Sequence, residues 1–339
     1  LERRLRAPYR LLIQLSAGFF GFSFLNRLAL FVIIFALMLA RQIPFSLLNN
    51  GTALNEAVQS VFDQYPILYS LRSLLAILCL FLFIVLLARI LDRRSWKDYG
   101  FHFRLAWWRD LVFGLALGGG LMGLIFAVQY ALGWVKITGR LFSSEMPFYA
   151  GILTALFHYI LIGIFEEWFA RGYQIRNIAE GLNLPRIGPK AALLIAYLLT
   201  SVGFGLFHAG NSNATIFSIV NLVLFGLMLG LGFLLTGDLA IPIGLHITWN
   251  FFQGNIFGLP VSGAASNISL LSIRQAGENI WTGGAFGPEG GLLGLLAISL
   301  AMLLIYAWCR WTRGKGSLHL AHTTYPQMDM ISSVTASGS

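Results

Sequence analysis

The chain has 339 residues, of which 57% are hydrophobic and only 11% are charged, and its formal net charge is +9. A soluble domain carries roughly 25% charged residues, so a soluble fold cannot hide this much apolar sequence. The positive charge does not indicate nucleic-acid binding, because the basic residues flank apolar runs as topology signals do. Cys79 and Cys309 are far apart, which excludes a disulfide framework and a thiolate zinc cluster.

Three regions follow from hydropathy. Residues 1–23 form a basic segment that we interpret as cytoplasmic or interfacial, and residues 24–310 form the transmembrane domain. A membrane helix needs about 20 mostly apolar residues, so we predict an all-α polytopic membrane protein with about eight transmembrane helices enclosing a polar intramembrane cavity. The predicted spans are 24–43, 73–91, 111–135, 148–170, 191–208, 215–236, 239–257 and 291–308.

The basic residues predict the orientation. With both termini in the cytoplasm, 18 of the 23 basic residues lie on the inner side. The outer side receives only Arg41, Arg72, Lys136, Arg140 and Arg274. This asymmetry follows the positive-inside rule and favours cytoplasmic termini.

Glycines and two polar stretches complete the outline. Gly118-Gly119-Gly120, and also Gly226, Gly230 and Gly232, are expected where helices pack closely or kink. We expect residues 258–290 to form a partly inserted or packed loop. Glu289 in this loop is interpreted as a turn residue, and the alternative is a role at the site if the loop folds inward. We expect residues 311–339 to form a polar, disordered cytoplasmic tail in which His319 and His322 are solvated.

Ionisable groups recur inside the predicted membrane domain, where they usually mark a functional site. Glu167 and Arg171 are four residues apart, so they share a helix face and predict an ion pair. Glu166 points about 100° away and is therefore free for another role, such as that of a general base. A charge cluster at a helix end is the alternative interpretation.

Two further clusters carry imidazole groups. His208 follows Phe204 by one helical turn at the end of its span, and alone it is typical of a helix-end residue bonded to a carbonyl. His246 and Asn250 share one face in the middle of a span, where an interhelical hydrogen-bonded pair is the alternative. Together, carboxylate and imidazole suit water activation, and imidazole and carboxamide suit an oxyanion pocket.

The motifs Glu166-Glu167-x-x-x-Arg171, Phe204-x-x-x-His208 and His246-x-x-x-Asn250 resemble those of the CAAX protease and bacteriocin-processing family, intramembrane endopeptidases that include the type II CAAX prenyl proteases. The resemblance covers roughly residues 96–308, the protease core. The stretches 249–254 and 282–290 also look like bacterial members.

The resemblance implies roles for these residues. Glu166 and His208 would activate the water, and His246 and Asn250 would bind the oxyanion. Glu167, Arg171 and Phe204 would support them. No cofactor is required in this glutamate-type mechanism. The alternative is zinc held by Glu166, His208 and His246, although the chain has no His-Glu-x-x-His motif.

The sequence therefore predicts an integral, multi-pass intramembrane endopeptidase of a bacterial plasma membrane. Its partners would be the lipid bilayer and a membrane protein or lipid-modified peptide as substrate, with no nucleic acid. A non-catalytic membrane scaffold or a bacteriocin-immunity-type protein on the same fold is the alternative. A transporter is disfavoured because no internal repeat is evident.

The predicted span boundaries contain one conflict. They put Glu166 near the inner end of its helix and His208 near the outer end of the next, roughly 20 Å or more apart at ~1.5 Å per residue. Either the helix of Glu166 continues towards Ala179, or the helix of His208 is tilted or broken near Gly203 and Gly205.

Overall fold

The computed structural model describes residues 5–64, 66–144, 146–314 and 318–323. Helices lie at all eight predicted spans. In chain order the elements are α1 (Ala7–Leu39), η1 (Phe45–Asn49), α2 (Gly51–Gln64), α3 (Pro66–Asp92), η2 (Lys97–Tyr99), α4 (Leu105–Ala131), β1 (Val135–Ser143), α5 (Phe148–Glu167), η3 (Trp168–Ile175), α6 (Arg176–Leu182), α7 (Gly188–Phe207), α8 (Ile216–Thr236), α9 (Ala240–Phe251), η4 (Phe252–Ile256), β2 (Ile268–Gln275), α10 (Asn279–Thr282), η5 (Pro288–Gly290), α11 (Leu292–Arg313) and η6 (Leu320–Thr323).

Six helical segments within the described part of the chain are long and apolar enough to cross a membrane. They comprise most of α3, then α4, the continuous helix Phe148–Leu182, α7, α8 and α11. In α1 only Arg27–Leu39 forms a shorter apolar stretch, and α9 has 12 residues. The chain is therefore an all-α polytopic integral membrane protein, and the predicted count of eight spans is not confirmed.

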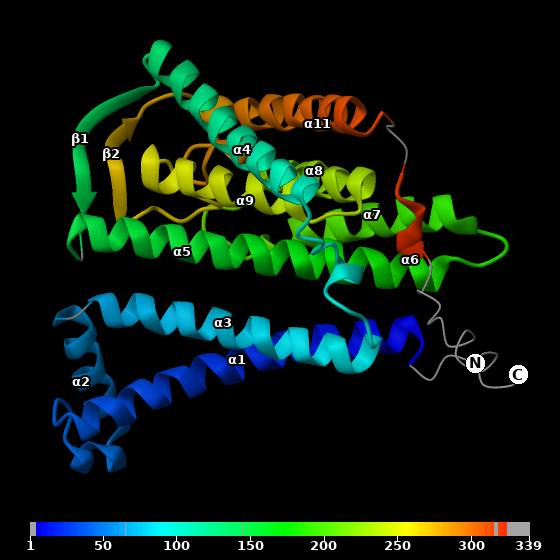
Figure 1. The fold of residues 1–339 in the computed structure, drawn as a ribbon. Helices are drawn as coiled ribbons and strands as arrows, with labels where there is room; N and C mark the ends of the chain where they lie inside the picture. The colour runs from blue at the N-terminus through cyan, green and yellow to red at the C-terminus, as the bar shows by residue number, and fades with distance from the viewer. Residues whose placement is uncertain (1–4, 65, 145, 315–317, 324–339) are drawn as a thin grey trace, which may run out of the picture.

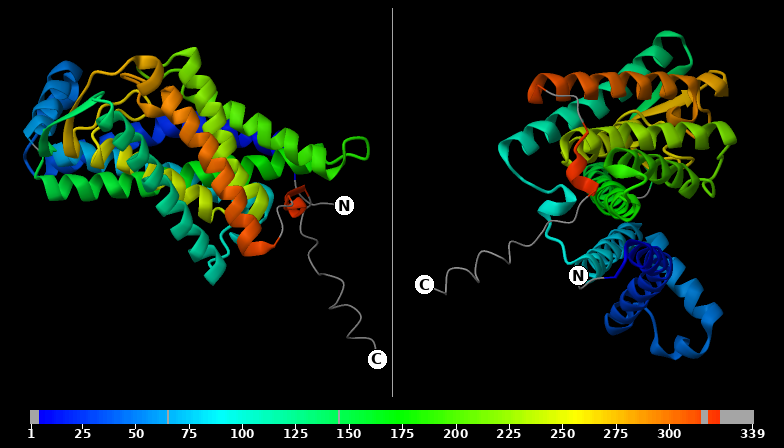
Figure 2. Two further views of the ribbon diagram at one scale, coloured as in Figure 1. Left: turned by 90° about the horizontal axis from the view of Figure 1, so that it is seen from above. Right: turned by 90° about the vertical axis from the view of Figure 1, so that its right-hand side faces the viewer.

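The long helices run back and forth between two ends of the molecule (Figures 1 and 2). At one end β1 and β2 form an antiparallel two-stranded sheet, which the sequence analysis did not predict. The first turn of α1, the end of α3, α6 and the last turn of α11 lie at the other end. The two strands fall in stretches that hydropathy assigns to loops.

Helix α9 lies at the centre of the helical core, packed against α4, α5 and α8. Its residues Ala240–Ile247 are all buried, and its two faces belong to different apolar clusters. Ile241, Leu245 and Trp249 join one cluster, whereas Ile243 and Ile247 join the other. A helix surrounded in this way holds its polar side chains in fixed positions.

Glycines allow α4 and α9 to approach closely. A Cβ atom on Gly114 or Gly118 would lie 2.5 Å or 2.4 Å from the carbonyl oxygens of Ile241 and Leu245. On α9, a Cβ atom on Gly244 would lie 2.5 Å from the Leu111 carbonyl oxygen. The predicted close contact at Gly118 is thus confirmed, as are those at Gly226, Gly230 and Gly232, whose added Cβ atoms would meet neighbours within 3.1 Å.

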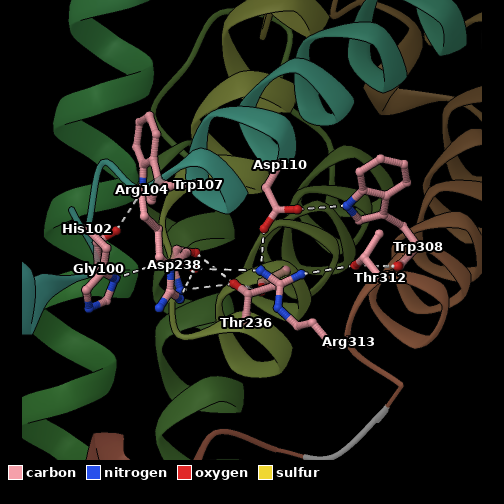
Figure 3. A network of polar contacts seen from close by, with 11 residues as sticks. Gly100, His102, Arg104, Trp107, Asp110, Thr236, Asp238, Trp308, Thr312 and Arg313 are labelled. Atoms are coloured by element: carbon pink, nitrogen blue, oxygen red, sulfur yellow. Dashed lines mark hydrogen bonds and ion pairs between the residues drawn. The ribbon is translucent and has the colours of Figure 1, made fainter.

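A buried ionic network fastens the helix ends opposite the sheet (Figure 3). Asp110 of α4 accepts hydrogen bonds from Trp308 Nε1 at 2.9 Å and from Arg313, both on α11. Asp238, between α8 and α9, pairs with Arg104 at 3.0 Å and with Arg313 at 3.6 Å, and it also contacts His102. Both aspartates are completely buried. The network therefore ties α4, α9 and α11 together.

The α1–α3 pair attaches to the core through a second network at the same end. Arg10 Nη1 donates to Asp92 Oδ1 at 2.9 Å, and Arg10 Nη2 donates to Glu180 Oε1 of α6 at 3.1 Å. Asn177 Nδ2 reaches Asp92 Oδ2 at 2.7 Å. Arg10 belongs to the predicted basic lead-in, residues 1–23, yet its side chain is 1% exposed because it joins three helices.

One part of the predicted tail packs against the helical core, although His319 is exposed as predicted. Helix α11 ends at Arg313, and Leu320–Thr323 form a short 3₁₀ turn. His322 is fully buried, and its ring stacks on Phe233 with ring centroids 4.1 Å apart. The prediction of a solvated His322 is therefore wrong, because the ring is buried against Phe233 of α8. Residues 324–339 of the predicted tail lie outside the described residues.

Candidate active site

The four predicted catalytic residues line one cavity of about 900 Å³. Glu166 comes from the last turn of α5, His208 caps the end of α7, and His246 and Asn250 come from α9. The structure therefore brings together carboxylate, imidazole and carboxamide groups from three helices. Apolar side chains of α1, α3, α7 and α8 form much of the remaining wall.

The depth conflict disappears because the helix of Glu166 does not end at residue 170. It continues through η3 and α6 to Leu182, and α7 packs against η3 and α6 on its way back (Figure 1). Counted from the 183–187 turn, Glu166 and His208 both lie about 25–30 Å along their helices at 1.5 Å per residue. The predicted boundary at Ala170 is thus wrong, and the alternative of a longer helix is confirmed.

Glu166 and Glu167 occupy different environments. Glu167 is fully buried, and Arg171 Nη1 donates to its Oε1 at 2.9 Å, which confirms the predicted ion pair. Arg171 Nη2 also donates to the Gly226 carbonyl at 3.0 Å, and its guanidinium lies over the Phe204 ring at 4.8 Å from the centroid. Glu166 is 33% exposed, so it faces the cavity with room for a water or a substrate.

His246 lies between the two glutamates. Its Nδ1 is 2.7 Å from Glu167 Oε1, and its Nε2 is 3.9 Å from Glu166 Oε2. Glu167 is paired with Arg171, so its carboxylate only accepts hydrogen bonds. The Nδ1 atom of His246 therefore carries a proton, and its Nε2 atom is directed into the cavity beside Glu166.

His208 is oriented by its own helix. Its Nδ1 lies 2.8 Å from the Phe204 carbonyl oxygen, which accepts the hydrogen bond. The Phe204 ring packs against it at 4.9 Å between centroids and also contacts His246 at 6.2 Å. Phe204 thus sets the positions of both imidazoles, and Nε2 of His208 is left for the cavity.

Asn250 lies one turn after His246 on the same face of α9. Its carboxamide makes no hydrogen bond to any described residue, and it lines the cavity. Trp249 beside it is 1% exposed and packs edge-on against Phe225. Buried neighbours thus hold the helix while the carboxamide keeps two N–H groups available for a ligand.

The zinc alternative would require Glu166, His208 and His246 to act together as ligands. Among the described residues no three His, Cys, Asp or Glu side chains converge on a position that would hold a metal ion. Glu166, His208 and His246 share the cavity without forming a tetrahedral ligand set, and Asn250 is a poor zinc ligand.

For Glu289 the sequence analysis favoured a turn residue over the alternative of a role at the site. Its loop folds inward, so the carboxylate lines the same cavity as Glu166 while being only 2% exposed. Burial raises the pKa of Glu289 to about 7, and hydrogen bonds from Ser262 and Gln253 oppose that rise. The signal was present in the stretches 249–254 and 282–290, which the structure joins through Gln253 and Glu289.

The fold and this cavity define an integral membrane protein with a polar site enclosed by helices. Residues 148–252 match the family model described as type II CAAX prenyl endopeptidase Rce1-like. This match confirms the resemblance over the segment that contains all three motifs. No curated protein and no solved structure was found to match the chain.

Proposed function

We propose that this protein is an intramembrane endopeptidase that hydrolyses a peptide bond of a membrane-associated protein or peptide. The convergence of Glu166, His208, His246 and Asn250 on one cavity carries the proposal. All four residues lie within the segment that matches an endopeptidase family. Substrates would be membrane proteins or lipid-modified peptides, reached from a bilayer that we propose to be a bacterial plasma membrane.

Glu166 and His208 are the proposed water activators. The Glu166 carboxylate would take a proton from water as the water oxygen attacks the peptide carbonyl carbon, and Nε2 of His208 would orient that water. The carbonyl electron pair moves onto oxygen to give a tetrahedral oxyanion. When the oxyanion collapses, the C–N bond breaks and the proton held by Glu166 passes to the leaving amine.

His246 and Asn250 are the proposed oxyanion donors. His246 already donates Nδ1–H to Glu167, so a second N–H at Nε2 requires the imidazolium form. The Asn250 carboxamide would supply the second hydrogen bond to the oxyanion.

A metal is not part of the proposed mechanism, since the side chains do not form a ligand set. Elemental analysis of the purified protein tests this directly. We expect less than one zinc per chain and cleavage that survives chelator treatment. Stoichiometric zinc that is lost in His208→Ala and His246→Ala would establish the zinc alternative.

Substitution of the site residues tests the peptidase proposal. We expect Glu166→Gln to lower cleavage about 100- to 10,000-fold, because the general base is lost. His246→Ala or Asn250→Ala would lower it about 100- to 1,000-fold through loss of an oxyanion donor. The measurement compares peptide termini in membranes from cells with the wild type and with each variant. Glu278→Gln, an exposed carboxylate outside the cavity, is the control.

The same comparison identifies the alternative. If Glu166→Gln membranes contain the same termini as wild type while a cellular phenotype of the protein persists, then the protein acts as a non-catalytic scaffold or immunity factor. If the wild type releases termini that every site variant lacks, and each variant accumulates as folded protein, the peptidase proposal stands.

A further inference from the structure

A strained turn forms part of the cavity wall. In the loop after η4, Val261 and Ala264 exchange two backbone hydrogen bonds of 2.8 and 2.9 Å. Ser262 and Gly263 between them have φ of 46° and 88°, as in a type I′ turn. A non-glycine residue persists at positive φ only where its surroundings determine the conformation, and Ser262 is held by contacts to Asn211 and Glu289.

The turn 261–264 packs against the loop that follows His208 and is hydrogen-bonded to it. Asn211 Nδ2 donates to the Ser262 carbonyl at 2.9 Å, and the Asn211 backbone N–H donates to the His208 carbonyl at 3.1 Å. A Cβ atom on Gly263 would lie 1.8 Å from the Ser212 carbonyl oxygen. The glycine therefore allows the turn to lie directly on the segment that follows His208.

Glu289 holds the other side of the turn. Its Oε1 accepts from the Ser262 backbone N–H and from Ser262 Oγ at 3.2 Å, and its Oε2 accepts from Gln253 Nε2. Gln253 is three residues after Asn250 and also donates to the Pro260 carbonyl. The carboxylate thus links the helix of Asn250 to the turn, and the turn links it to the His208 loop.

We propose that Glu289 is a positioning residue that, through the 261–264 turn, fixes the His208 loop relative to the helix that carries His246 and Asn250. Its effect on cleavage rests on the proposed peptidase function, whereas its effect on the loop does not. Both carboxylate oxygens are occupied by donors of the protein, which assigns Glu289 to positioning and not to contact with the reacting atoms.

The hydrogen-bond donors of Ser262 and Gln253 explain why position 289 carries a carboxylate. Three donor groups, Ser262 N–H, Ser262 Oγ–H and Gln253 Nε2–H, meet Glu289, and each needs an acceptor. Glutamine would keep one oxygen for Ser262 but would present N–H groups to Gln253. Alanine would leave all three donors without this acceptor. A graded effect, alanine greater than glutamine, is therefore expected.

Hydrogen exchange of the full-length protein in nanodiscs tests the positioning. We expect backbone amides of residues 208–215 to exchange at least about tenfold faster in Glu289→Ala, and less so in Glu289→Gln. Asn211→Ala should reproduce the effect, and the double variant should add little, because both substitutions interrupt one chain of contacts. Glu278→Ala, an exposed carboxylate of the same loop, should leave the segment unchanged.

Cleavage kinetics provide a second test of the positioning role. The substrate is one identified by comparing peptide termini in wild-type and variant membranes. We expect Glu289→Ala to lower kcat at least about tenfold with KM changed less than threefold, and Glu289→Gln to recover part of the loss. Unchanged exchange at 208–215 in folded Glu289→Ala and Asn211→Ala would overturn the proposal, as would a rise in KM alone, which indicates substrate contact. If Glu289→Ala does not fold, hydrogen exchange at residues 208–215 in Glu289→Gln and Asn211→Ala tests the proposal instead. If the wild type cleaves nothing, the exchange result still decides the positioning.

Discussion

Adjacent glutamates lie in different environments because of helix geometry. Glu167 turns towards α9 and is fully buried between Arg171 and His246, whereas Glu166 is 33% exposed beside the cavity. Successive residues differ by about 100° on a helix, which separates a carboxylate that orients an imidazole from one that is free to accept a proton. Two titratable groups in contrasting environments are the usual sign of divided acid–base roles.

Glu289 gives a pH prediction at the same scale. Its pKa of about 7 in the folded protein lies above the ordinary 4.5. Its contribution to stability is therefore fully present below pH 4.5 and is lost as the pH rises through 7. We expect Glu289→Gln to gain stability relative to wild type between pH 4.5 and pH 8, by at most about 3 kcal/mol.

Thermal unfolding in detergent at a series of pH values measures this difference. Glu278→Gln, which removes an exposed carboxylate of the same loop, should differ from wild type by a constant amount. A difference between Glu289→Gln and wild type that does not change with pH would contradict the raised pKa. The expected combination of higher stability at pH 8 and lower cleavage is typical of a buried charge kept for function.

Residue spacing predicted some of these contacts and not others. The Glu167–Arg171 pair follows from i,i+4 geometry, because both partners are on one helix. The contact between His246 and Glu167 joins residues 79 positions apart, and it depends on how α9 packs against α5. Glu289 is 78 positions from Asn211 and 81 from His208 along the chain, and only the folded loop brings these residues to one wall.

At the scale of elements, two π-helical segments border the site. η3 begins immediately after Glu167, and η4 begins two residues after Asn250. A π-helical turn holds an extra residue and is frequent at functional sites. Arg171 lies in η3 and donates to both Glu167 and the Gly226 carbonyl, and Gln253 lies in η4 and donates to Glu289.

The close contact between α4 and α9 at Gly118 should be needed for both stability and cleavage. Gly118→Ala would place a Cβ atom 2.4 Å from the Leu245 carbonyl oxygen and the Thr248 hydroxyl, so α9 must move. We expect a loss of about 1–3 kcal/mol and a fall in cleavage, because His246 and Asn250 move with the helix. Thermal unfolding and the cleavage assay measure the two effects.

Gly120 provides the matched control on the same helix. A Cβ atom there meets nothing within 4 Å, so Gly120→Ala should be neutral or should stabilise α4 by roughly 0.5–1 kcal/mol through the lower flexibility of alanine. Equal behaviour of the two variants would show that the close approach of α4 and α9 does not matter for the site.

Hydropathy located the helices but not their ends. It ended the helix of Glu166 at residue 170, because the next turns contain Arg171, Arg176, Asn177 and Glu180. Three of these side chains have partners on other helices: Arg171 donates to the Gly226 carbonyl, Asn177 donates to Asp92, and Glu180 pairs with Arg10. The helix continues past them to Leu182. A hydropathy average along the sequence cannot tell whether a polar side chain will bind water or a partner inside the protein. The predicted helix of Glu166 was therefore too short, and this error produced the apparent difference in depth between Glu166 and His208.

At the scale of the whole molecule, charge is distributed along the axis of the helices. Arg94, Arg104, Arg186 and Arg313 lie at the end that contains α6, and all belong to the predicted cytoplasmic set (Figures 1 and 3). The sheet at the other end carries Lys136, Arg140 and Arg274 of the small predicted outer set. These members of the two predicted sets thus lie at opposite ends of the molecule.

Labelling of single cysteines tests the proposed orientation. In a background with Cys79→Ser and Cys309→Ser, we expect a membrane-impermeant maleimide added to intact cells to label Glu278→Cys but not Arg186→Cys. Both positions are exposed and lie at opposite ends of the molecule, and both should be labelled after permeabilisation. The reverse pattern would place the sheet in the cytoplasm. It would then contradict the charge argument, because most Lys and Arg residues would face the outside.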